Sequence, residues 1–135
     1  FAQERNGRYP KTFKMYKFRS MVHNAEDLLK DLMDRNEQTG PVFKINDDPR
    51  ITKVGKVIRK TSIDELPQLF NVLLGDMSMV GPRPERPFFA EKYQQNMPEF
   101  AFRTKVKAGL AGYAQVYGKY NTTPYDKLKL DLTYI

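Results

Sequence analysis

Prolines and glycines divide residues 61–84 into short elements, and they limit the fold more than any other feature of this chain. Proline lacks a backbone N–H, so it is excluded from the interior of helices and of central strands. A helix that contains Pro67 must therefore begin shortly before it, and Gly75 is suited to end it. Residues 81–84, Gly-Pro-Arg-Pro, cannot be regular structure. The segment predicts one short helix followed by a fixed turn.

Two starting points compete for this helix. Ser62 followed by Glu65 matches a capping box, but Pro67 would then remove a helical hydrogen bond. A start at Asp64 keeps Pro67 within the first turn, where proline is tolerated, and is favoured for that reason. The helical spacing predicts apolar side chains that face the core: Leu66, Leu69, Phe70 and either Leu73 or Leu74.

The rest of the chain predicts a single α+β domain, residues 1–135, that is rich in helix and has a short sheet or hairpins. Alternating aromatic residues favour extended structure over residues 13–21, and glycines flank a short strand expected at residues 113–117. Further helices are expected at residues 87–96 and from Thr123 onward.

Two more helices are expected nearer the N-terminus. Asn24 can cap a helix that ends at residues 40–41, Gly-Pro. Asp48 before Pro49 predicts the start of the next helix. That helix would be amphipathic, with an apolar stripe and a basic face. The stripe consists of Ile51, Val54 and Ile58, and the basic face consists of Arg50, Lys53, Lys56, Arg59 and Lys60.

The charge limits the class of partner. A formal net charge of +7 favours polyanions, which include nucleic acid, anionic lipid headgroups and phosphorylated small molecules. Without cysteine, disulfides and thiolate metal sites are excluded. No apolar run approaches the roughly 18 residues that span a bilayer. The sequence starts at Phe1 without an initiator methionine and ends at Ile135 inside an alternating apolar pattern, so we expect a longer parent chain.

Adjacent carboxylates at Asp64 and Glu65 can be explained in two ways. They can stabilise a helix N-terminus, where the helix dipole favours acids. They can also form a catalytic pair, because an aspartate can attack a phosphoryl group and Mg²⁺ binds one or two carboxylates together with substrate phosphates. The second function requires cations nearby to offset the repulsion of an anionic substrate.

Several cations lie close enough in sequence to serve that purpose. Arg59 precedes Asp64 by five residues, and Arg83 lies between two prolines that limit its backbone freedom. A guanidinium in a fixed turn suits bidentate phosphate binding, although it can equally tie the turn to a helix end. Residues 14–19 alternate aromatics with cations, which is typical of single-strand nucleic-acid binding or of a solvated strand edge.

Residues 17–21, 47–84 and 108–118, taken together, resemble the bacterial sugar transferase domain of monotopic polyprenyl-phosphate sugar-1-phosphate transferases. The resemblance implies that Asp64 is the nucleophile, that Glu65 helps to hold Mg²⁺, or Mn²⁺, beside Asp64, and that Arg83 binds phosphate. Further phosphate-binding positions are implied at Arg59, Lys17 and Arg19.

The resemblance also implies a reaction and a location. Sugar-1-phosphate would pass from a UDP-sugar to Asp64, releasing UMP, and then to polyprenyl phosphate, which starts synthesis of a surface glycan. The implied location is the cytoplasmic face of the bacterial plasma membrane, with a re-entrant membrane helix upstream and a basic, membrane-facing surface. Nucleic acid is not an implied partner, whereas a homo-oligomer is possible. The chain departs from the family pattern at Pro10, Ala108, Ala111 and Tyr113.

Overall fold

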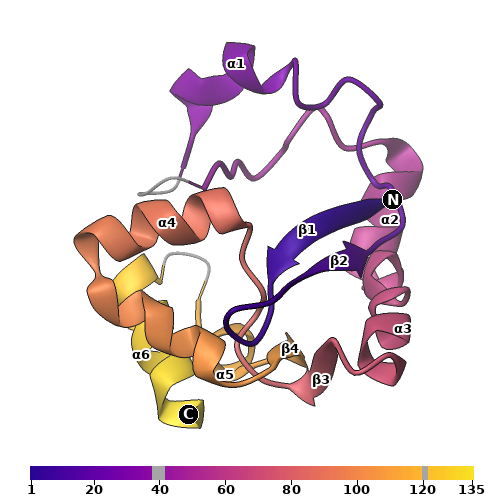
Figure 1. Ribbon diagram of the computed structural model, residues 1–135. Helices are drawn as coiled ribbons and strands as arrows, with labels where there is room; N and C mark the ends of the chain where they lie inside the picture. The colour runs from indigo at the N-terminus through magenta and orange to yellow at the C-terminus, as the bar shows by residue number, and fades with distance from the viewer. Residues whose placement is uncertain (38–41, 120–121) are drawn as a thin grey trace.

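The computed structural model describes residues 1–37, 42–119 and 122–135. Its strands form two separate pairs, shown in Figure 1. β1 (Ala2–Asn6) and β2 (Thr12–Tyr16) form an antiparallel hairpin, and β3 (Met77–Val80) runs parallel to β4 (Ala108–Ala111). The expected α+β fold with short sheets is confirmed. The extended segment is shorter than expected, because β2 ends at Tyr16.

The strand expected at residues 113–117 is wrong. A short helix, α5 (Tyr113–Val116), occupies these residues, and β4 lies just before them. The glycines there serve a close backbone approach: a Cβ on Gly109 would lie 2.1 Å from the backbone nitrogen of Gly81. The glycine pattern therefore marks the contact between β4 and the turn that follows β3, not the ends of a further strand.

The C-terminal half contains the main apolar cluster. Helix α4 (Pro87–Asn96) has the predicted bounds, and α6 (Pro124–Tyr134) begins where predicted, with Thr123 accepting a hydrogen bond from the backbone N–H of Asp126. Between them lies the 3₁₀ segment η3 (Pro98–Lys105). The cluster consists of Ala90, Phe100 and Leu128, with Tyr93, Met97 and Leu132 around them.

The first predicted helix is much shorter than expected. Only α1 (Leu29–Leu32) and the 3₁₀ turn η1 (Met33–Arg35) form, and neither contains a buried residue. Helices this short depend on packing against other elements, so without a buried face this one does not extend back to Asn24. The end predicted at residues 40–41 lies outside the described residues.

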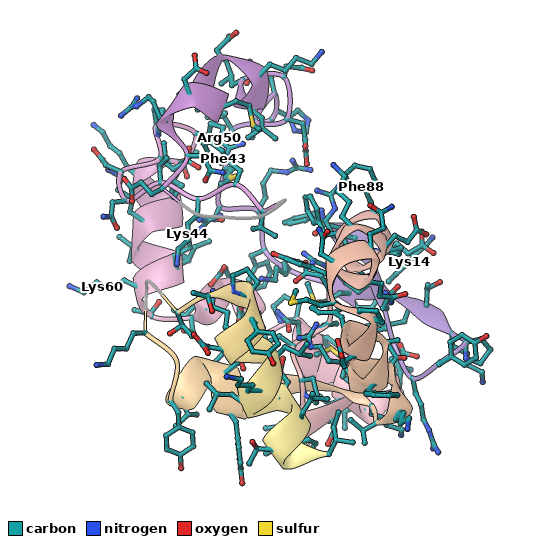
Figure 2. All side chains as sticks on the ribbon, turned by 90° about the vertical axis from the view of Figure 1, so that its left-hand side faces the viewer. Lys14, Phe43, Lys44, Arg50, Lys60 and Phe88 are labelled. Atoms are coloured by element: carbon teal, nitrogen blue, oxygen red, sulfur yellow. The ribbon has the colours of Figure 1, made fainter. Side chains whose placement is uncertain are left out.

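Helix α2 (Lys53–Lys60) begins later than predicted. Thr52 is its N-cap, and its hydroxyl accepts from the backbone N–H of Gly55 at 2.9 Å. Asp48 does not cap a helix because its carboxylate is bound by the buried Arg50 at 2.6 Å. The Arg50 guanidinium also lies over the ring of Phe43, which Figure 2 shows beside it.

The predicted apolar stripe of α2 does not form a buried face. Val54 is 70% exposed. Ile51 and Ile58 are only partly buried. The lysines lie on the outside of the helix as expected, and Lys60 points away from the body of the protein in Figure 2.

Helix α3 (Gln68–Leu73) has the opposite orientation to the one predicted. A 3₁₀ turn, η2 (Ile63–Glu65), precedes it and Pro67 is at its N-cap position, so neither Ser62 nor Asp64 starts the helix. Its inward residues are Gln68 and Asn71, each fully buried. The predicted core residues are exposed instead: Leu66, Leu69, Phe70, Leu73 and Leu74.

Asn71 explains this orientation. Its side-chain amide donates to the carbonyl of Lys14 at 2.8 Å, and its oxygen accepts from the backbone N–H of Tyr16 at 3.0 Å. These bonds satisfy partly buried backbone groups of β2. Helix α3 is thus held against the hairpin by polar contacts, and its apolar face is left toward solvent. Among the described residues, no helix is long and apolar enough to cross a membrane.

Candidate active site

The two predicted catalytic carboxylates lie in η2, between α2 and α3. Successive side chains in a 3₁₀ turn point about 120° apart, so Asp64 and Glu65 face different surroundings. Asp64 is 8% exposed and lines a pocket, whereas Glu65 turns toward the loop that follows β3. The backbone N–H of Phe18 donates to the carbonyl of Asp64 at 3.0 Å, which fixes the segment after β2 against the pair.

The pocket that contains Asp64 is predominantly cationic. It encloses about 260 Å³ between the segment after β2 and the C-terminal half of α2. The charged side chains in its lining are four cations, Arg5, Lys17, Arg19 and Arg59, and two carboxylates, Glu26 and Asp64. Such an excess of fixed positive charge suits a phosphorylated ligand.

Two of these cations are held in place by neighbours. Arg59 donates from Nε to the hydroxyl of the buried Ser20 at 2.8 Å, so α2 and the segment after β2 share one wall of the pocket. The guanidinium of Arg19 lies 5.3 Å from the centre of the Phe1 ring. Arg59 and Asp64 line the same pocket, as their spacing suggested.

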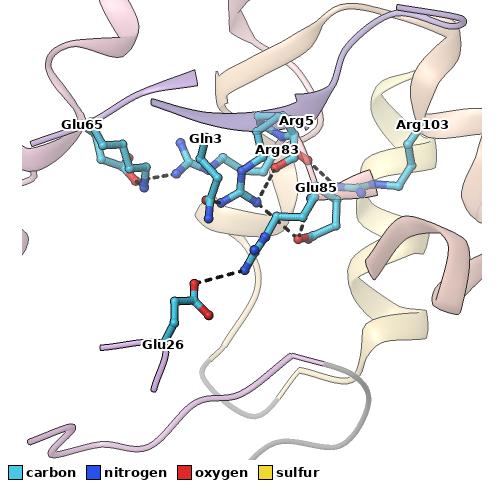
Figure 3. Close-up of polar contacts among 10 residues, drawn as sticks. Gln3, Arg5, Glu26, Glu65, Arg83, Glu85 and Arg103 are labelled. Atoms are coloured by element: carbon cyan, nitrogen blue, oxygen red, sulfur yellow. Dashed lines mark hydrogen bonds and ion pairs between the residues drawn. The ribbon is translucent and has the colours of Figure 1, made fainter. Parts of the chain in front are cut away.

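Glu65 is bound by two cations, Lys17 at 2.9 Å and Arg83 at 2.5 Å. Figure 3 shows the side chain of Arg83 beside Glu65. Burial alone would raise the pKa of Glu65, but the two cations outweigh burial and hold that pKa below its ordinary value. The pKa of Lys17 is lowered by burial, which the contact with Glu65 only partly offsets. Lys17 belongs both to this ion pair and to the lining of the Asp64 pocket, so it connects the two carboxylates.

Arg83 lies in the irregular Pro-Arg-Pro turn, as predicted, and its guanidinium bridges three parts of the fold. Besides Glu65, it donates to the carbonyl of Leu110 in β4 at 2.7 Å and approaches the side-chain oxygen of Gln68 at 3.4 Å. The sequence also allowed a structural function for Arg83, in which it ties the turn to a helix end. In the structure, Arg83 ties the turn to strand β4 instead.

A second arginine supports this turn from the opposite side. Arg103 donates to the carbonyl of Arg83 and to the carboxylate of Asp131, both at 2.8 Å. Burial raises the pKa of Asp131, and Arg103 opposes that rise. The position of Arg83 therefore depends on α6 as well as on its flanking prolines.

Sequence reasoning missed three residues of the site. Arg5 is partly buried in β1 beside Glu85 and lines the Asp64 pocket, yet in the sequence it is one of many basic residues near the N-terminus. Gln68 reads as a surface residue of α3 but is fully buried beside Arg83. The partners of Arg103 lie 20 and 28 residues away, and no local pattern indicates them.

The carboxylates of Asp64 and Glu65 could hold a metal ion only together with oxygen atoms of a substrate. Among residues 1–37, 42–119 and 122–135, no cluster of three or more acidic or histidine side chains could hold one. Mg²⁺, however, is commonly bound by one or two carboxylates plus substrate phosphates, and Asp64 with Glu65 offers that number.

A comparison against protein families identifies the family of this chain. Residues 1–135 match the model of the bacterial sugar transferase family, and the chain belongs to this family. It is 52% identical, over its full length, to a galactosyl transferase of Streptococcus agalactiae.

Two further relatives carry more specific names. The chain is 44% identical over its full length to a UDP-N-acetylgalactosamine-undecaprenyl-phosphate N-acetylgalactosaminephosphotransferase of Aeromonas hydrophila. It is 45% identical, over 93% of its length, to an undecaprenyl-phosphate galactose phosphotransferase of Salmonella typhimurium. The chain spans 30% of the length of the first two relatives and 26% of the third.

Proposed function

We propose that this domain transfers sugar-1-phosphate from a UDP-sugar to polyprenyl phosphate through a covalent intermediate on Asp64. The observation that carries the proposal is the position of Asp64: a carboxylate, 8% exposed, in a pocket whose lining holds four cations. A solvated helix cap needs no such surroundings. The names of the Aeromonas and Salmonella relatives, which specify undecaprenyl phosphate, support the acceptor class.

In the first half-reaction, a carboxylate oxygen of Asp64 attacks the phosphorus that bears the sugar. The bond from this phosphorus to the bridging oxygen breaks, and UMP leaves with the electron pair. Arg59, Lys17 and Arg19 stabilise the diphosphate charge from the pocket lining. The chemistry is mainly positioning and charge neutralisation, which such a cationic pocket supplies.

In the second half-reaction, a phosphate oxygen of the acceptor attacks the same phosphorus. The Asp64 carboxylate leaves, and polyprenyl diphosphate sugar forms. Glu65 holds Lys17 and Arg83 in place through its two ion pairs, so they face the reacting phosphates with fixed geometry. Mg²⁺ or Mn²⁺, held by Asp64 and Glu65, would neutralise phosphate charge when bound.

We also place this domain at the cytoplasmic face of the plasma membrane. Support comes from the exposed apolar side chains of α3, among them Phe70 at 66% and Leu73 at 82% exposure. Lys53, Lys56 and Lys60 on the adjacent α2 are exposed cations suited to anionic headgroups. A product with a polyprenyl tail requires a location of this kind.

Intact-protein mass spectrometry tests the proposal. The protein is incubated in detergent with Mg²⁺ and a panel of UDP-sugars, without acceptor. We expect a mass gain of one sugar phosphate, which disappears on addition of polyprenyl phosphate and is not formed by Asp64→Asn. Wild-type protein that is folded but forms no adduct with any donor would contradict the mechanism.

A further inference from the structure

An open apolar groove runs beside the candidate active site, between the end of β2 and α3. It encloses about 630 Å³. Its side walls are mostly aromatic and aliphatic: Phe1, Tyr16, Phe18, Phe70 and Leu74. Phe18 is 53% exposed and Leu74 is 69% exposed, so a large apolar surface is left uncovered in one hollow.

This groove is continuous with the Asp64 pocket. Phe1, Lys17 and Phe18 line both of them. Lys17 is the one cationic side chain among the described residues that line the groove, and its ammonium lies 2.9 Å from Glu65. The junction therefore joins a hydrocarbon-like channel to a cationic pocket, with one lysine at the boundary.

We propose that this groove binds the first isoprene units of the acceptor, with the acceptor phosphate at Lys17. The inference rests on the proposed function and assigns a place to the acceptor tail. Charge complementarity selects the occupant, because an amphiphile with an anionic head and a branched hydrocarbon tail matches both halves of the junction. Contact with a flat bilayer surface would require neither a groove in the protein nor a lysine at the end of that groove nearest Asp64.

Adjacent leucines at the C-terminal end of α3 provide a matched pair of variants: Leu73 is its last residue and Leu74 is its C-cap. Leu74 lines the groove, while Leu73, 82% exposed, is outside the described lining. Both side chains are mostly exposed, so Leu74→Ser and Leu73→Ser should both leave folding intact. The two variants remove similar apolar area from the same helix and differ chiefly in whether they alter the groove.

Photolabelling measures binding directly. A polyprenyl phosphate with a photoreactive group in its first isoprene units is irradiated with the protein in detergent, and the labelled peptides are identified by mass spectrometry. We expect label on α3 and on the segment after β2, with competition by unlabelled polyprenyl phosphate. Leu74→Ser should weaken binding about tenfold and Leu73→Ser by less than about threefold, since burying a leucine contributes roughly 1.5 kcal/mol or more.

The alternatives give different results. Equal losses in both variants would show that the whole α3 face contacts lipid or detergent, and would overturn the assignment. Label elsewhere, or a Leu74→Ser variant whose only change is loss of a dimer on sizing, would also overturn it. The aspartyl phosphosugar forms without the acceptor, so a protein that does not form it contradicts the proposed function. Photolabelling tests the groove separately, because it measures acceptor binding and does not require that reaction.

Discussion

Replacing Glu65 with glutamine should make the stability of the protein less dependent on pH. In the folded protein, Lys17 and Arg83 hold the pKa of Glu65 below its ordinary value of 4.5. A carboxyl whose pKa is lowered by folding stabilises the folded state above its unfolded pKa, and this contribution is lost as the pH falls through the folded pKa. Glu65→Gln removes that contribution and leaves the two cations without their shared carboxylate.

The size of the effect follows from the geometry. Hydrogen bonds to charged groups contribute about 1.5–3 kcal/mol each, and the value must be reduced here because all three side chains retain partial exposure, between 21% and 28%. We expect Glu65→Gln to lower the free energy of unfolding by about 1–2 kcal/mol at pH 7.

Urea unfolding at a series of pH values, followed by circular dichroism, measures this difference. The gap between wild type and Glu65→Gln should be full at pH 7 and should shrink as the pH falls below about 4.5. Lys56→Gln is a suitable control, because its ion pair with Asp47 is largely exposed and should contribute little. A gap for Glu65→Gln that stays constant down to acid pH would refute the ion-pair account.

Three further predictions concern the framework of the site. Asn71→Leu should cost about 2–4 kcal/mol of unfolding free energy by urea titration, since it removes the buried amide and its two hydrogen bonds to partly buried backbone groups of β2; a cost below about 1 kcal/mol would contradict the polar docking of α3. Gly109→Ala should cost at least about 2 kcal/mol in thermal unfolding, because the new methyl meets the Gly81 backbone, and an unchanged melting temperature would show that this contact is loose. Arg83→Ala should lower kcat/KM by a factor equivalent to about 2–4 kcal/mol; unchanged kinetics would remove its phosphate role.

Helices with strong local signals could be predicted from the sequence. α4 and α6 begin with proline, after signals that act within a few residues. Likewise, no regular structure forms at residues 81–84, because the prolines forbid it regardless of the surroundings.

The orientation of α3 could not be predicted in the same way. Its sequence shows two faces, but periodicity does not say which face is buried. The usual assumption places the apolar face inward, and here the hydrogen bonds of Asn71 to β2 reverse it. Asp48 likewise resembles a cap, and only its tertiary contact with Arg50 shows otherwise.

Prediction of the site residues was also limited, because their surroundings depend on tertiary contacts. Asp64 and Glu65 are visible as neighbours, but their separation into a pocket carboxylate and an ion-pair carboxylate follows from the 3₁₀ turn. Arg5 and Arg103 reach the site from distant parts of the chain. Contacts of that kind depend on the tertiary fold, which a single sequence does not reveal.

Locating the phosphosugar by peptide mapping tests the central claim most directly. Wild type, Asp64→Asn and Glu65→Gln would each be incubated with the reactive UDP-sugar, quenched, digested and sequenced by tandem mass spectrometry. We predict the sugar phosphate on Asp64 in wild type, no adduct in Asp64→Asn, and an adduct still on Asp64, formed more slowly, in Glu65→Gln. A phosphosugar found on Glu65, or one that persists in Asp64→Asn, would contradict the account.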